Sequence, residues 1–127
     1  MRTAQKHLNP NGVFIFDGWF GPAVLSQKPE KRSHEYRDGK NTIVREVNPH
    51  LDPVRQTVTV HYDISVNRNE QIIKQFEEDH IMRFMFVQEM ALLMQSAGLK
   101  LVHYCPFLEP DGQLSTDTWN VTSVARL

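Results

Sequence analysis

Cysteine is nearly absent from this sequence, and that scarcity narrows the compartment in which the protein works. Cys105 is the only cysteine among 127 residues, so an intramolecular disulfide bond is impossible. Secreted proteins of this size often carry paired cysteines, whereas the reducing cytoplasm keeps thiols free. We therefore predict a cytoplasmic protein.

Long apolar runs and an excess of charge are also absent. Apolar runs such as residues 12–16 are too short to span a bilayer. The first seven residues carry charge but no apolar stretch, unlike a signal peptide. The formal net charge is −1, which provides no basic surface for a polyanion. We therefore expect no membrane and no nucleic acid among the partners.

Metal-binding and nucleophilic motifs are missing as well. Five of the six histidines are scattered singly along the chain, at His7, His34, His50, His61 and His103. None has the spacing of a metal-binding pair on one helix or of a cluster with Cys105. We expect these side chains to be exposed or hydrogen-bonded, and we predict no metal site. Local sequence suggests no Ser-His-Asp or Cys-His arrangement either.

The first structural signal is a short apolar segment, Val13-Phe14-Ile15-Phe16, between the turn residues 9–12 and Asp17-Gly18. A continuous apolar run without alternation indicates a strand buried on both faces, as in a parallel sheet. No earlier strand in the sequence could pair with it, which indicates part of a larger α/β sheet. Residues 18–41 contain prolines, glycines and a charge cluster, and we interpret them as a loop with at most a short helix.

The middle of the chain has a different pattern, that of an antiparallel sheet. Residues 54–66 alternate between two faces, and the apolar face holds Val54, Val58, Val60, Tyr62, Ile64 and Val66. Such alternation predicts a long half-buried strand. A polar turn at 67–70 leads into a returning strand at 71–82, and a β-prone segment at 42–47 adds to this hairpin before residues 48–53 break it. We define residues 42–84 as an antiparallel insert within a single domain, 1–127.

The last third returns to mixed α/β patterning. Residues 86–97 carry an apolar stripe at helical spacing, formed by Val87, Met90, Ala91, Met94 and Ala97. Gly98 is placed to end this helix in the left-handed conformation. Strands are predicted at 99–104 and 119–125, with a loop between them. The fold class is therefore α/β for the whole sheet, with α+β character in this chain.

Several segments together resemble class I S-adenosylmethionine-dependent methyltransferases. Residues 6–17 are similar to the helix end, Leu-x-Pro-Gly-Gly turn and fifth strand of that family, with Asn11 at the first glycine of the turn. Residues 78–84, 88–90 and 96–99 resemble the end of the substrate-side insert and the helix and strand after it. Residues 114–121 resemble the final antiparallel strand. The nearest subgroup includes sugar N,N-dimethyltransferases, which carry an antiparallel insert at this place.

This resemblance implies the C-terminal part of a Rossmann-like methyltransferase sheet. The parent enzyme would use S-adenosylmethionine to methylate a small molecule. The family's glycine-rich first loop and its ribose-binding acidic residue have no counterpart here. We therefore expect no cofactor-binding residues in this chain and no activity from it alone.

Two groups of residues are candidates for the acceptor site. Asp17, Trp19 and Phe20 leave the carboxyl end of the first strand, where ligands bind in open α/β sheets. The resemblance places this loop beside the methyl acceptor. The alternative is that Trp19 and Phe20 simply cover the core.

The second group lies at the end of the insert. Glu78 and His80 share one face of the returning strand, and Arg83 follows them. His80 is a candidate base, because a neighbouring carboxylate can orient its ring or raise its pKa. Arg83 could pair with an acceptor carboxylate or with Glu89. We favour the alternative, a structural Glu–His–Arg cluster, and assign no catalytic residue beyond the candidate His80.

Two other functions fit the same sequence. One is a non-catalytic binding module, which would cover both faces of Val13–Phe16 within the chain. The other is an interaction protein that pairs through an open strand edge. The early strand lacks a preceding partner, so one of its edges would expose unpaired backbone groups, and we predict a homodimer through that edge.

Overall fold

The computed structural model describes residues 1–127, which form two compact units. The first unit comprises Met1–Gln27 and Arg83–Leu127, and the second comprises Lys28–Met82. Hydrogen bonding gives one mixed sheet of seven strands in the order β2-β3-β4-β5-β1-β7-β6. A mixed sheet with few helices confirms the predicted α/β class. The longest helix has ten residues, and none of the helices has the length and hydropathy needed to cross a membrane.

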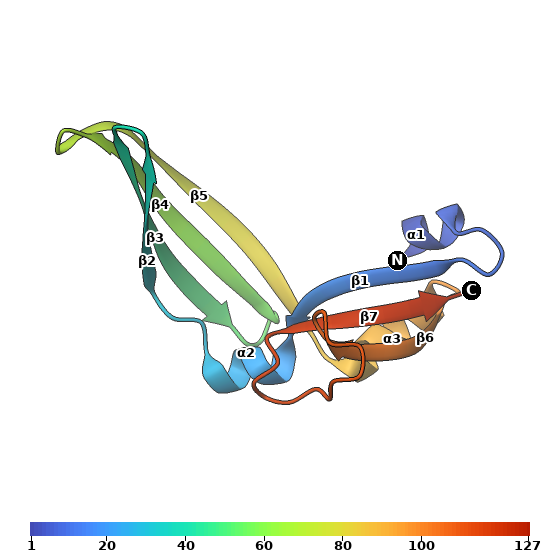
Figure 1. The fold of residues 1–127 in the computed structure, drawn as a ribbon. Helices are drawn as coiled ribbons and strands as arrows, with labels where there is room; N and C mark the ends of the chain where they lie inside the picture. Colours follow the sequence, from blue (N-terminus) through green and yellow to red (C-terminus); the bar gives the residue numbers. More distant parts are fainter. The chain divides into compact units, whose positions relative to one another are not determined.

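The first unit places three short helices around four strands (Figure 1). Its helices are α1 (Arg2–His7), α2 (Gly21–Gln27) and α3 (Val87–Ser96). Its strands are β1 (Val13–Phe20), β6 (Lys100–Pro106), β7 (Asn120–Arg126) and the end of β5 (Gln71–Met85). This unit therefore contains both terminal segments of the chain.

Strand β1 is paired unequally on its two sides. It runs antiparallel to β7 from Val13 to Trp19, but pairs with β5, in parallel, only at Trp19 and Phe20. Val13 to Gly18 thus have a partner strand on one side only. The prediction of a strand buried on both faces is wrong, because Val13 and Ile15 are 41% and 64% exposed. Phe14 and Phe16 face α3 and the residues flanking α1, and no helix of this unit packs on the opposite face.

Helix α3 supplies much of the core of the first unit and confirms the apolar stripe. Met90 and Met94 are fully buried, so both methionines fill the core. Gly98 has a φ of 72°. Its N–H donates to the Gln95 carbonyl at 3.0 Å and that of Leu99 to the Met94 carbonyl at 2.9 Å. This bond pair is the Schellman motif, and it requires the left-handed conformation that glycine adopts without cost.

The second unit is an antiparallel sheet of β2 (Arg32–Asp38), β3 (Asn41–Asp52), β4 (Thr57–Arg68) and most of β5. It starts before residue 42, the predicted start of the insert. Strand β2 lies in residues that we interpreted as a loop. Its side chains are all exposed, so it lacks the apolar alternation by which a strand is detected.

Strand β3 also continues through residues 48–52, which were predicted to break it. Pro49 pairs across β4 with Val60. Strand β2 reaches only Val47, so β3 has no neighbour on its other side at Pro49. An edge position tolerates proline because no neighbouring strand needs its missing N–H.

Strand β4 agrees with the predicted alternation except at its start. Val58 and Val60 are buried, whereas Tyr62 and Ile64 are half-buried. Val54 is 91% exposed and lies in the β3–β4 turn, so its assignment to the apolar face is wrong. The Asp52 carboxylate accepts the Val54 and Arg55 N–H groups at 3.0 Å, which stabilises the turn. The predicted β4–β5 turn is present, with positive φ at Asn69 and Glu70.

Candidate functional site

The carboxyl end of β1 brings the two tryptophans of the chain together. The rings of Trp19 and Trp119 meet edge to face with their centroids 5.3 Å apart. The Phe20 N–H donates to the Trp119 carbonyl at 2.8 Å, which fixes the start of β7 beside the end of β1. Trp19 is half-buried.

An open pocket adjoins Trp119 in the loop between β6 and β7. Its lining is mostly polar and comprises Pro106, Phe107, Glu109, Gln113, Ser115, Asp117, Thr118, Trp119 and Asn120. Polar groups beside an aromatic face suit a small hydroxylated or aminated ligand. The signal in the sequence was weak, since these residues lie in a segment that we predicted only as a loop.

The other two candidates on β1 have different environments. Asp17 is exposed and pairs with Thr122 of β7. Phe20 is only 7% exposed and packs with Ala23, Met90 and Val121 in the core. Phe20 therefore has the core-covering role that we weighed against acceptor binding, whereas Asp17 and Trp19 remain accessible.

Arg83 pairs with Glu89 within the first unit. The Arg83 guanidinium donates to Oε1 of Glu89, which lies in the first turn of α3. The helix dipole stabilises a carboxylate at this position. Because Arg83 lies on β5 and Glu89 on α3, their ion pair holds the junction between the two elements. Oε2 of Glu89 is buried and has no hydrogen-bond partner.

Glu78 and His80 lie on the second unit, as neighbours on one face of β5. His80 Nε2 is 3.3 Å from Glu78 Oε2, and both side chains are about half exposed. The His80 ring packs edge to face against Tyr62 at 5.1 Å. An exposed histidine held by a carboxylate and an aromatic ring can accept a proton from a ligand on this face.

The same face carries an arginine between two tyrosines. The Arg45 guanidinium carbon lies 5.5 Å from the ring centroids of both Tyr36 and Tyr62. Its Nε is buried without a hydrogen-bond partner. Sequence reasoning missed this cluster because Tyr36 lies on the undetected strand β2.

The opposite face of the sheet carries a histidine among carboxylates. His61 Nδ1 is 2.8 Å from Asp79 Oδ1, and its Nε2 is 3.5 Å from Asp63 Oδ1. The hydrogen bond with Asp79 raises the pKa of His61 above its ordinary value, and the charges of Asp63 and Asp79 add to the effect. The sequence did not show this cluster, because Asp79 comes from β5 whereas His61 and Asp63 come from β4.

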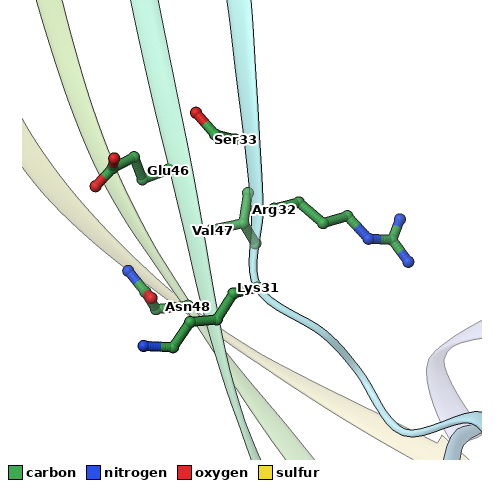
Figure 2. A pocket seen from close by; sticks show the side chains of 6 residues that line it. All are labelled: Lys31, Arg32, Ser33, Glu46, Val47 and Asn48. Atoms are coloured by element: carbon green, nitrogen blue, oxygen red, sulfur yellow. The ribbon is translucent and has the colours of Figure 1, made fainter.

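A shallow pocket lies near this cluster, between β2 and β3, and is lined by Lys31, Arg32, Ser33, Glu46, Val47 and Asn48 (Figure 2). Figure 2 shows the Arg32 side chain directed away from Glu46 and Asn48. Arg32 pairs with Val47, which stands between these two residues on β3, and successive side chains of a strand point to opposite faces of the sheet. Asn48 Nδ2 donates to Asp63 Oδ2 at 3.3 Å. The pocket and the histidine cluster thus share one polar face of the second unit.

Comparison with known proteins gives a fold but no close relative. No protein-family model matches the chain, and no curated protein matches its sequence. A methyltransferase from Clostridium acetobutylicum that depends on S-adenosylmethionine matches in structure with a TM-score of 0.72 and 21% identity, over 99% of this chain and 48% of its own. A sugar N-methyltransferase from a Streptoalloteichus species matches with a TM-score of 0.72 and 16% identity, over 99% and 47%.

A third solved structure, with S-adenosylmethionine bound, is an amino pentose methyltransferase from Micromonospora echinaspora. It matches with a TM-score of 0.70 and 14% identity, over 99% of this chain and 48% of its own. The chain thus spans about half the length of the methyltransferases that it matches. This is consistent with the C-terminal half that the sequence resemblance implies. The chain has the fold of one half of a class I S-adenosylmethionine-dependent methyltransferase.

Proposed function

We propose that this chain is the acceptor-side half of a cytoplasmic methyltransferase that modifies a small molecule and is inactive without a cofactor-binding half. The observation that carries the proposal is the extent of the structural match. Nearly all of this chain superposes on methyltransferases, yet it accounts for only about half of each. The buried free thiol of Cys105 fits a reducing compartment.

S-adenosylmethionine, bound by the other half, would supply an electrophilic methyl group. The residues of this chain would hold the acceptor in line with that group and exclude water, which is the main catalytic requirement of a methyl transfer. Trp19, Trp119 and the polar β6–β7 loop offer a wall for the acceptor in the first unit.

Two of the solved structures that match are described as sugar or amino pentose methyltransferases. An amino sugar is therefore the acceptor class to test first.

His80 is the candidate base in the second unit. An amine acceptor loses a proton on methylation, and His80 is exposed, with Glu78 to orient its ring. The proposed acceptor-site residues of the first unit are Asp17, Trp19 and Arg83. Those of the second unit are Glu78 and His80. The ion pair with Glu89 makes Arg83 a positioning residue, since it holds the junction of β5 and α3.

Replacing His80 with alanine tests this assignment in an enzyme assembled from this chain and a cofactor-binding half. We expect kcat/KM for the acceptor to fall by roughly 10²-fold, the usual contribution of a positioned base. The affinity for S-adenosylmethionine should stay unchanged, since His80 lies outside the cofactor half.

His50 is a matched control, because it is an exposed histidine of the same unit. His50→Ala should leave the kinetics unaltered. The assignment of His80 fails if its replacement weakens the cofactor affinity while the acceptor kinetics remain normal.

Self-association is a second proposal, favoured by the unpaired side of β1. Natural sheets protect exposed edges with lysine, proline, bulges or charge. The edge strand β6 has Lys100, Pro106 and an irregularity between Leu101 and His103. The edge strand β2 consists largely of polar and charged residues. Val13 to Gly18 have no such protection apart from Asp17, so we propose a two-fold homodimer through this edge.

A further inference from the structure

His61 lies at the centre of a ligand set contributed by two neighbouring strands. It stands on β4 with Asp63, while Glu77 and Asp79 stand on β5. The donor atoms of His61, Asp63 and Glu77 all lie within 4.8 Å of one another. All of these residues belong to the second unit, and extended strands position them with less freedom than a loop would allow.

The hydrogen bonds of the imidazole decide which of its nitrogen atoms is available. A neutral histidine has one N–H and one lone pair. Asp79 Oδ1, at 2.8 Å, accepts the Nδ1–H and fixes the tautomer. Nε2 lies 3.5 Å from Asp63 Oδ1. In the protonated ring Nε2 donates to this carboxylate, and in the neutral ring its lone pair is free to bind a metal ion that takes the place of that proton.

His61 is the one side chain that offsets the negative charge of Asp63 and Asp79 through an ion pair. No lysine or arginine forms an ion pair with Asp63, Glu77 or Asp79, and His61 is the only cationic partner of either aspartate. Glu46 lies directly opposite Asp63 on β3 and adds a further carboxylate. The amide of Asn48 holds Oδ2 of Asp63, which leaves Oδ1 directed at His61.

The geometry of these groups suits a transition metal. Ligands about 2.0–2.2 Å from one metal ion lie roughly 3–3.5 Å apart, close to the Nε2–Oδ1 separation. A metal-binding histidine usually donates its other N–H to a carboxylate, as His61 does to Asp79. Mixed imidazole and carboxylate ligands favour Zn²⁺ or Mn²⁺ over Mg²⁺ and Ca²⁺, which prefer oxygen alone.

We infer that His61 Nε2, Asp63 and Glu77 bind a divalent transition-metal ion, with Asp79 orienting the imidazole. The ion links β4 to β5 and neutralises the carboxylates of this face. An open pocket lined by Glu46, Asp63, Ser65 and Gln75, among others, adjoins Asp63 and gives the ion access from solvent. Histidine spacing alone predicted no metal site, because Glu77 joins His61 and Asp63 only where β5 lies beside β4 in the folded sheet.

Calorimetric titration of the whole chain with ZnCl₂ or MnCl₂ tests the inference without cofactor or acceptor. We expect one ion per chain, bound through these three ligands. His61→Ala should weaken binding by at least 100-fold, and Asp79→Asn by about 10–100-fold through loss of the orienting carboxylate. His34→Ala, which removes an exposed histidine of the same unit, should change nothing.

Unfolding measurements distinguish a metal ion bound by His61 Nε2 from a proton on the same atom. A bound ion stabilises the fold by an amount that grows with the logarithm of its concentration above Kd, so Zn²⁺ should raise the Tm of the wild type but not that of His61→Ala. Circular dichroism without metal shows whether the variant is folded, and His61→Gln serves instead if it is not. No binding at millimolar metal, or equal binding by wild type and folded variant, would overturn the inference. Neither result bears on the proposed methyltransferase function.

Discussion

Replacing Met94 with alanine is expected to lower the free energy of unfolding of the first unit by about 2–5 kcal/mol. Met94 is completely buried and packs with Leu99 and Ala125, against which Leu8 and Phe14 also lie. Truncation removes apolar contacts and leaves a cavity, which a short helix on one sheet face cannot close. Both tryptophans belong to this unit, so urea unfolding followed by tryptophan fluorescence reports on it selectively.

Leu92→Ala is the matched control for this substitution. Leu92 lies on the same helix but is 66% exposed, so its truncation should change stability by less than about 0.5 kcal/mol. Equal effects of the two substitutions would show that α3 does not pack on β1 and β7 through Met90 and Met94.

Replacing Ile15 with lysine is expected to weaken the proposed homodimer by roughly 10-fold or more in Kd. In a two-fold pairing of β1 edges, Ile15, which is 64% exposed in the single chain, would contact side chains of the partner strand on the open face of the sheet. Cross-strand apolar contacts contribute up to about 1 kcal/mol each, so the loss of one in each copy corresponds to roughly this change in Kd. The lysine also protects the edge against pairing. Sedimentation equilibrium at micromolar concentration measures the dissociation constant.

Val102→Lys distinguishes the β1 edge from the β6 edge. Val102 is an exposed apolar residue of β6, at the other side of the same unit. Its replacement should leave the dimer intact. A wild-type chain that sediments as a monomer, or a dimer lost only with Val102→Lys, would refute pairing through β1.

The sequence predicted those elements whose apolar pattern matches their final burial. Helix α3 was predicted from its stripe, and Gly98 from the conformation needed at its end. The alternation of β4 predicted an antiparallel hairpin, with a register confirmed by the burial of Val58 and Val60. The resemblance to methyltransferases rested on the order of these elements, and it agrees with the structural matches.

Errors arose where burial depends on neighbours that the local sequence does not specify. Ile15 belongs to an apolar run, yet it is exposed because no helix of its unit covers that face. Pro49 was taken to end a strand, and it is tolerated because β2 ends before it. The expectation that His61 would be exposed or hydrogen-bonded agrees with its hydrogen bond to Asp79, but the sequence did not predict this partner, because residue spacing within β4 says nothing of how β5 aligns with it.

We propose that this chain forms the acceptor side of a methyltransferase without the cofactor site. Calorimetric titration of the folded chain with S-adenosylmethionine tests this proposal most directly. The glycine-rich loop and the ribose-binding acidic residue of the family have no counterpart in the sequence, so we predict no measurable binding at millimolar cofactor. A dissociation constant in the micromolar range would show that this chain holds the cofactor by itself, and would contradict the account.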